Sequence, residues 1–413
     1  MNAYSIAVLA LLVFGWALDW TVERLNLHHA SPDLPPEFAD AYDAERYARS
    51  QRYLRETTLF GLFRSTVMLA ATIVFLLAGG FRWLHGLAVS FSDNTIAQGL
   101  AFAGALLMIS LLAGLPFEGY RTFVIEERFG FNRTTPRTFV LDRVKGLALS
   151  ALIGAPLFAL ILWLFETFAG AWLWAWSATN VFQTAVAFVA PVAILPLFNK
   201  FAPLEEGELR SRLSEYAANQ RYRLGGVFTI DGSRRSTKTN AYFTGFGKTK
   251  RIALFDTLVA RHSTDELVAV LAHEVGHAKL GHVGKRIALG WAASLPMFAG
   301  LAFFLPRTGL YEGFGVEGTP IYVGFALFGF LYAPASLLLG IAGNVVSRRH
   351  EYAADAFAAR TTGRPEALAT ALKKLSAHNL GNLTPHPLKV FLEYSHPPVI
   401  DRIRALAKAG ETT

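Results

Sequence analysis

Seven long apolar runs limit the fold of this chain more than any other feature of its sequence. Each run has roughly 15 residues or more, and about 20 residues of helix are needed to cross a bilayer. The runs cover residues 4–20, 62–81, 96–117, 146–165, 171–198, 287–305 and 321–346. Kinked or tilted helices can accommodate the prolines in the fifth and seventh runs. The sequence therefore predicts seven membrane-spanning helices.

Composition agrees with a membrane protein and limits the metal ligands that the chain can offer. Charged residues make up 17% of the chain, against about 25% in soluble domains. Cysteine is absent, so disulfides and thiolate metal sites are excluded, and a metal would need His and carboxylate ligands. The first apolar run has neither a basic segment before it nor a small-residue cleavage pattern after it. We therefore interpret it as an uncleaved span rather than a signal peptide.

Positive charge is divided unevenly between the two sides of this bundle. With seven spans, the segments 21–61, 118–145, 199–286 and 347–413 lie on one side, and they hold all but three of the 39 lysines and arginines. The positive-inside rule makes this side cytoplasmic and the N-terminus external. The net charge of +8 then reflects topology and attraction to an anionic lipid bilayer. Because no basic run is interleaved with aromatic residues, we expect no nucleic-acid partner.

On this topology the chain divides into four segments. These are transmembrane helices 1–5 with their cytoplasmic loops (1–198), a cytoplasmic segment (199–286), transmembrane helices 6 and 7 (287–346) and a cytoplasmic helical tail (347–413). The cytoplasmic segment begins with a linker and an amphipathic helix. It continues with β-rich stretches that predict a hairpin or a three-stranded sheet, at 223–230, 239–244 and 251–254.

Within the cytoplasmic segment, His273, Glu274 and His277 form a motif with a defined chemistry. Ser263 and Glu266 form a capping box that starts a helix, and the two His lie four residues apart on one of its faces. Both imidazoles can then bind one Zn²⁺, while Glu274 reaches a water that the metal activates. Polar residues open this helix and return before the next apolar run. We therefore place the metal at or near the cytoplasmic interface rather than inside the bilayer.

A catalytic zinc generally has three protein ligands, so a third must come from elsewhere in the chain. The stretch after the seventh run offers Glu351 and Asp355, four residues apart on one helix face, with His350 as a rival ligand. One carboxylate could bind the metal while the other orients a ligand His. Alternatively, Glu351 could pair with Arg348 or Arg349 at a charged membrane boundary.

These motifs resemble the type I CAAX prenyl proteases, which are multi-pass membrane zinc endopeptidases of the gluzincin kind. The resemblance covers nearly the whole chain. The matching stretches are LPFE (115–118), FVIEERFGFN (123–132), TNAYF (239–243), HEVGH (273–277), SRRHEYAAD (347–355) and YSHPP (394–398). Together with the apolar runs, the resemblance implies a mainly α fold. We expect a seven-transmembrane-helix bundle with a small cytoplasmic α+β zinc-peptidase domain.

Carried over residue by residue, the resemblance implies one zinc ion per chain and a role for each motif residue. The implied zinc ligands are His273, His277 and Glu351. Glu274 would be the general base, and Asp355 matches the family's second acidic residue, either a proton donor or an orienter of a ligand His. Two further residues, His396 and Arg402, match positions that face the site and stabilise the oxyanion or the substrate carbonyl. Without the resemblance, we would interpret them as a polar loop and a solvated helix face.

The resemblance also gives the strand around Asn240, Ala241 and Tyr242 a role in substrate binding. Peptidases bind their substrates extended, and an exposed strand edge supplies backbone hydrogen bonds without demanding a particular sequence. Gly245 and Gly247 would let the following turn approach the peptide closely. An ordinary sheet strand would have the same sequence pattern.

The predicted function is zinc-dependent hydrolysis of peptide bonds in a peptide or protein substrate. The resemblance implies a C-terminally prenylated substrate, from which the family removes the last three residues. The alternatives are a membrane quality-control metalloprotease without prenyl specificity, and a non-catalytic zinc-containing scaffold or transporter. Short external loops and an Ala/Arg-rich tail favour the inner membrane of a bacterium. In a eukaryote the corresponding location would be the endoplasmic reticulum membrane.

Overall fold

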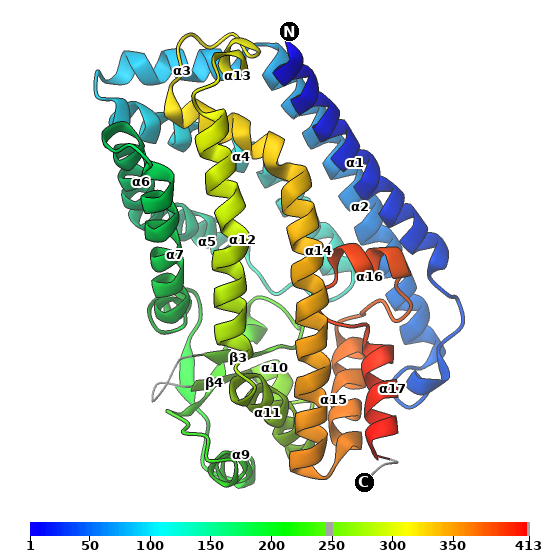
Figure 1. Ribbon diagram of the computed structural model, residues 1–413. Helices are drawn as coiled ribbons and strands as arrows, with labels where there is room; N and C mark the ends of the chain where they lie inside the picture. The colour runs from blue at the N-terminus through cyan, green and yellow to red at the C-terminus, as the bar shows by residue number, and fades with distance from the viewer. Residues whose placement is uncertain (245–250, 411–413) are drawn as a thin grey trace.

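The structure, a computed structural model, describes residues 1–244 and 251–410, and within them it contains the seven predicted membrane-spanning helices (Figure 1). Three of these spans contain a π-helical turn. The spans are α1 (Ala3–His29), α2 (Ala44–Leu77), α4–η2 (Thr95–Tyr120 and Arg121–Glu126), α5–η3–α6 (Pro136–Leu149, Ser150–Gly154 and Ala155–Thr167), α7–η4–α8 (Ala171–Val189, Ala190–Ile194 and Leu195–Phe198), α12 (His282–Phe304) and α14 (Ile321–Thr362). The predicted number of spans is confirmed.

Several of these helices extend beyond the apolar runs that predicted them. Helix α12 begins at His282, before the run at 287–305, and α14 continues for 16 residues past position 346. Hydropathy reports only the part of a helix that meets lipid, because polar residues outside the bilayer continue the same backbone hydrogen bonding. Of the prolines in the long runs, Pro191 lies in the π-helical turn η4 and Pro334 lies inside α14. Such turns are one way in which a helix accommodates the hydrogen bond that a proline removes.

At the end of the bundle that carries the N-terminus, α3 (Gly80–Phe91) and α13 (Thr308–Glu312) lie across the helix ends (Figure 1). A buried apolar cluster joins them to the spans and includes Leu84, Phe102, Tyr311 and Leu327. Many large apolar side chains on the flanks of the spans remain exposed, as expected for surfaces that contact lipid.

The opposite end holds a four-stranded mixed sheet with the strand order β1-β2-β4-β3. Its strands are β1 (Phe201–Pro203), β2 (Val227–Ile230), β3 (Ala241–Thr244) and β4 (Arg251–Phe255). The two central strands are parallel, and each edge strand pairs with its neighbour in the antiparallel sense. The prediction of a hairpin or three strands was therefore incomplete. The missing strand, β1, has three residues and ends in a proline, so it has almost no β pattern to detect.

Further helices surround the sheet and the C-terminal half of α14 (Figure 1). They are α9 (Glu208–Asn219), α10 (Asp256–Val259), α11 (Thr264–Lys279), α15 (Pro365–His378), α16 (Pro387–Glu393) and α17 (Val399–Gly410), with short 3₁₀ turns at η1 (Pro36–Phe38) and η5 (Gly232–Arg234). The capping box of α11 is confirmed, because the side chains of Ser263 and Glu266 each accept a hydrogen bond from the other residue's backbone N–H. Leu267, Leu271 and Val275 face the core of this end, which fixes the opposite face of α11 toward α14.

Candidate active site

The two motif histidines of α11 meet a carboxylate from α14. The Nε2 atoms of His273 and His277 lie 3.1 Å apart. Glu351 places Oε2 at 3.4 Å from Nε2 of His273 and Oε1 at 3.3 Å from Nε2 of His277. Among the described residues, these three form a group of ligand atoms all within 4.8 Å of one another. Two helices that are about 75 residues apart in the chain therefore converge on one point.

Close helix packing makes this convergence possible. A Cβ atom built on Gly276 would lie 3.2 Å from the backbone of Ala354 and 3.1 Å from the ring of Phe357. Glycine is therefore the residue that lets α11 approach α14 so closely, between the two elements that carry the ligand atoms.

The distances in this group match those of a single tetrahedral metal ion. Ligand atoms about 2.0–2.2 Å from one Zn²⁺ in tetrahedral geometry lie ~3.3–3.5 Å from each other. The two Nε2 atoms, 3.1 Å apart, are close to that value, and each lies 3.3–3.4 Å from a different oxygen of Glu351. With one ligand atom taken from each residue, the group stays within 4.8 Å. The donor set of two imidazoles and one carboxylate is also one that catalytic zinc sites use. The residues present therefore fit a metal ion.

The remaining ring nitrogens of both histidines are held by other side chains. Nδ1 of His273 lies 2.8 Å from Oδ1 of Asp355, and Nδ1 of His277 lies 2.9 Å from Nδ1 of His282. These contacts turn both Nε2 atoms toward Glu351. His350, the rival ligand in the sequence, is not part of the group. Its ring stacks on His282, with centroids 4.0 Å apart and planes at 10°.

A buried arginine completes the charge balance of the site. Arg402 of α17 donates from Nε and Nη2 to the two carboxylate oxygens of Asp355, at 2.8 and 2.7 Å, and its Nη1 lies 3.6 Å from Glu351. Burial alone would lower the pKa of His273, but hydrogen bonds with Asp355 and Glu351 raise this pKa to about 9. The carboxylates thus outweigh the arginine, and the site favours a cation.

Glu274 has the environment expected of a general base. It follows the first histidine on α11 and is only partly accessible to solvent. Burial raises the pKa of its carboxyl, while the neighbouring histidines lower it. A carboxylate whose proton affinity is raised in this way is better matched to proton transfer near neutral pH.

The structure places the other predicted substrate-facing residues on a loop beside Glu351 and at the edge strand β3. His396 is exposed, and its Nε2 lies 3.4 Å from Oε1 of Glu351, while Nδ1 lies 3.0 Å from the hydroxyl of Ser395. Asn240 is exposed beside β3, and its carbonyl accepts from the backbone N–H of Phe255 at 3.2 Å. Ala241 and Tyr242 lie in β3, where their backbones pair with β4. Gly245 and Gly247 lie outside the described residues.

Sequence reasoning missed the role of His282. The Gly-His pair at 281–282 follows the motif, but the five-residue separation of His282 from His277 does not suggest a contact on one continuous helix. The chain turns at Gly281, where φ is +69°, and α12 starts in a new direction. This turn brings His282 into contact with His277. To predict the contact from sequence, one would have had to predict that Gly281 ends the first helix.

Comparisons with known proteins agree with this geometry over the whole chain. Residues 23–200 match the family model "CAAX prenyl protease N-terminal, five membrane helices", and residues 203–409 match "Peptidase family M48". CAAX prenyl protease 1 of Saccharomyces cerevisiae is 36% identical over 405 residues, which cover 92% of this chain and 89% of that protein. The homolog of CAAX prenyl protease 1 from Homo sapiens is 31% identical, with 96% and 94% covered.

A solved structure shares the fold as well as the sequence. The crystal structure of S. mikatae Ste24p aligns with a TM-score of 0.91 and 34% identity, covering 98% of this chain and 99% of that one. The resemblance seen in the motifs and the predicted fold class are thus confirmed. The chain belongs to the CAAX prenyl protease 1 family within peptidase family M48, and it is a multi-pass membrane metalloendopeptidase.

Proposed function

We propose that this chain uses one Zn²⁺ to hydrolyse peptide bonds near the C-terminus of prenylated proteins. The observation that carries the proposal is the convergence of His273, His277 and Glu351 on one point, with Glu274 beside them. The names of the relatives supply the substrate class, since they are CAAX prenyl proteases. A purely structural zinc would not need a carboxylate with a raised pKa next to its ligands.

In this proposal each side chain has one task. His273, His277 and Glu351 hold the metal, which lowers the pKa of water and polarises the scissile carbonyl when it is bound. Glu274 takes a proton from the attacking water and passes it to the leaving amine. Asp355 accepts from Nδ1 of His273 and fixes the orientation of that ring, so we assign it the orienting role rather than proton donation.

His396 and Arg402 have different tasks because their environments differ. The exposed ring of His396 can donate a hydrogen bond to a substrate carbonyl or oxyanion beside Glu351. The guanidinium of Arg402 is buried and bonded to Asp355 through two nitrogens. It therefore neutralises the carboxylate of Asp355 and holds it in place. Its positive charge also favours the negative charge that develops on the reacting carbonyl oxygen.

Substrate binding is assigned to the edge strand β3. Asn240 directly precedes the strand and Ala241 and Tyr242 begin it; β3 pairs with β4 on one side and is at the edge of the sheet. An extended peptide can add to such an edge through backbone hydrogen bonds.

The proposed topology places this site on the cytoplasmic side, with an external N-terminus. The support is the concentration of lysine and arginine in the loops on the side of the metal site. The short external loops favour a bacterial inner membrane, while the named relatives are eukaryotic, which favours the endoplasmic reticulum. Protease protection of sealed vesicles, followed by detection of an N-terminal tag, tests the orientation.

One assay on the purified full chain tests the chemistry. Metal content is measured first, and cleavage of a farnesylated peptide and its unmodified twin is then followed with and without a chelator. We expect about one zinc per chain, chelator-sensitive cleavage and a preference for the farnesylated peptide. Glu274→Gln should retain zinc and lose cleavage. Equal cleavage of both peptides would refute prenyl specificity and favour general proteolysis, and bound zinc without cleavage of either would favour a scaffold.

A further inference from the structure

The FVIEERFGFN stretch (123–132), which none of the proposed catalytic steps uses, contacts the segment that leads into β3. We call residues 235–240 the lead-in segment. Its backbone is joined to the end of this stretch, because the N–H of Thr237 donates to the carbonyl of Phe131 at 3.0 Å and the N–H of Arg133 donates to the carbonyl of Arg235 at 3.0 Å. The membrane-helix part of the chain is thus bonded directly to the approach to the edge strand.

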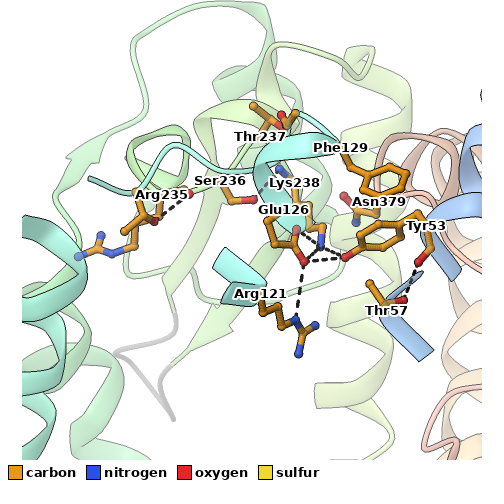
Figure 2. A network of polar contacts seen from close by, with 12 residues as sticks. Tyr53, Thr57, Arg121, Glu126, Phe129, Arg235, Ser236, Thr237, Lys238 and Asn379 are labelled. Carbon is orange, nitrogen blue, oxygen red and sulfur yellow. Dashed lines mark hydrogen bonds and ion pairs between the residues drawn. The ribbon is translucent and has the colours of Figure 1, made fainter. Parts of the chain in front are cut away.

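Lys238 is the centre of this contact (Figure 2). Its Nζ lies 2.9 Å from Oε2 and 3.2 Å from Oε1 of Glu126, and it donates to the hydroxyl of Tyr53 at 2.7 Å. Tyr53 in turn donates to Oε1 of Glu126 at 2.7 Å. Figure 2 shows these three side chains meeting from α2, the end of η2 and the lead-in segment.

The surroundings make this triangle stronger than a surface ion pair. The side chain of Glu126 is 15% exposed and that of Lys238 is 31% exposed. Lys238 also lies over the rings of Tyr53 and Phe131, at 4.9 and 4.4 Å from their centroids. Partial burial reduces screening by water, and the two rings add cation–π attraction. Removing Glu126 leaves the charge of Lys238 in a poorly solvated place, whereas removing Lys238 leaves Glu126 with the exposed Arg121, whose Nε lies 3.8 Å from Oε1.

The other end of the lead-in segment is held by Asn379, the C-cap residue of α15. The side chain of Asn379 accepts from the N–H of Thr239 at 3.0 Å and donates to its carbonyl at 3.2 Å. Lys238 therefore directly precedes Thr239, which Asn379 holds on both sides of its backbone, and β3 begins two residues later at Ala241. Among the described strands, β3 pairs with β4 alone, so its position depends on how its approach is anchored.

We infer that Glu126 and Lys238 are positioning residues for substrate. Their ion pair, which we call the latch, lets the membrane helices hold the edge strand β3 in the position where it binds substrate. This inference rests on the proposed binding of substrate along β3. Neither side chain touches substrate in this scheme. Loss of the latch weakens peptide binding while leaving the metal ligands on α11 and α14 in place.

The test compares Lys238→Met and Glu126→Gln with the matched control Lys373→Met. Lys373 of α15 likewise pairs with a carboxylate of the N-terminal part of the chain, at 3.0 Å from Asp40, but this pair does not involve the lead-in segment. All variants are purified as full chains, and metal content, kcat, KM and hydrogen exchange of the 239–244 amides are measured. The exchanged double variant Glu126→Lys with Lys238→Glu is included as a rescue.

We expect both latch variants to raise KM about tenfold, to change kcat less than about twofold and to keep full metal occupancy. Exchange of the 239–244 amides should become faster, and the exchanged double variant should recover part of both effects. Lys373→Met should resemble the unmodified chain. Unchanged amide exchange in both latch variants, or an equal KM effect in Lys373→Met, would overturn the inference.

This design separates the latch from the proposed function. If the unmodified chain cleaved no peptide, the proposed function would fail, but amide exchange would still report whether Glu126 and Lys238 anchor β3. If cleavage were normal and exchange rose without any change in KM, the anchor would be real and its role in substrate binding would be refuted.

Discussion

The packing of α11 against α14 predicts that Gly276→Ala lowers metal affinity, although residue 276 is not a ligand. The added Cβ would lie 3.2 Å from Cα of Ala354, whereas carbon atoms prefer about 3.5–4.0 Å. A backbone atom in the middle of a helix cannot rotate away, so α14 must move by a few tenths of an ångström. Glu351 is three residues earlier on the same helix and moves with it.

The size of the effect follows from the tolerance of metal sites. Metal–ligand distances vary by only about 0.2 Å, so a shift of Glu351 by a few tenths of an ångström is enough to weaken its bond to the metal. Overpacking of this kind costs about 1–3 kcal/mol, and each 1.4 kcal/mol expressed at the site is a tenfold loss in affinity. We therefore expect metal affinity to fall roughly 10- to 100-fold.

A competition titration with a chromophoric chelator measures this loss on the purified full chain. Gly284→Ala is the control, because it makes the same substitution nearby on α12 and its new Cβ meets nothing within 4 Å. Gly284→Ala should bind metal as the unmodified chain does. Equal affinities for Gly276→Ala and Gly284→Ala would show that α14 does not set the position of Glu351, and the packing argument would be refuted.

Three further predictions concern the same region. Asp355→Asn should lower metal affinity about 10- to 100-fold by removing the carboxylate that orients His273, and unchanged affinity in the same titration would contradict that role. Ser263→Ala removes the N-cap of α11 and should cost about 1 kcal/mol, seen as a lower thermal-unfolding midpoint with metal affinity retained. Because burial raises the pKa of Glu274 and a base must be ionised, kcat/KM should fall as pH drops through a value above the ordinary 4.5. A pH profile that stays flat to 4.5 would remove Glu274 as the base.

The spans and the start of the metal helix could be predicted from sequence because each depends on local rules. Apolar length alone identifies a membrane helix, and the Ser263–Glu266 capping box is complete within four residues. The sheet was predicted only partly, since the parallel pairing of β2 with β4 depends on residues that are far apart in sequence. Short strands such as β1 carry too few residues for a period of two to show.

For the candidate site too, features set by nearby residues could be predicted and those set by distant residues could not. The spacing of His273 and His277 fixes their common face on α11, and Glu351 and Asp355 share a face of α14 for the same reason. Spacing could not say which carboxylate meets which histidine, because that depends on the rotation of one helix against the other. It also could not reveal that Arg402 would be bonded to Asp355 rather than free to face substrate.

The candidate metal site is assembled between α11, which is not one of the predicted spans, and the membrane helix α14. Glu351 lies 30 residues after the start of α14, a distance of about 45 Å along a continuous helix, and the hydrocarbon core of a bilayer is about 30 Å thick. The carboxylate is therefore carried on a rigid extension of the seventh span. The two histidines lie on a helix that is separated from the sixth span by the turn at Gly281, so they are located by packing against α14. Since one candidate ligand lies on the membrane helix and the other two are positioned by contact with it, residues 199–286 alone do not hold all three ligand atoms. The membrane part of the chain therefore contributes to the candidate site.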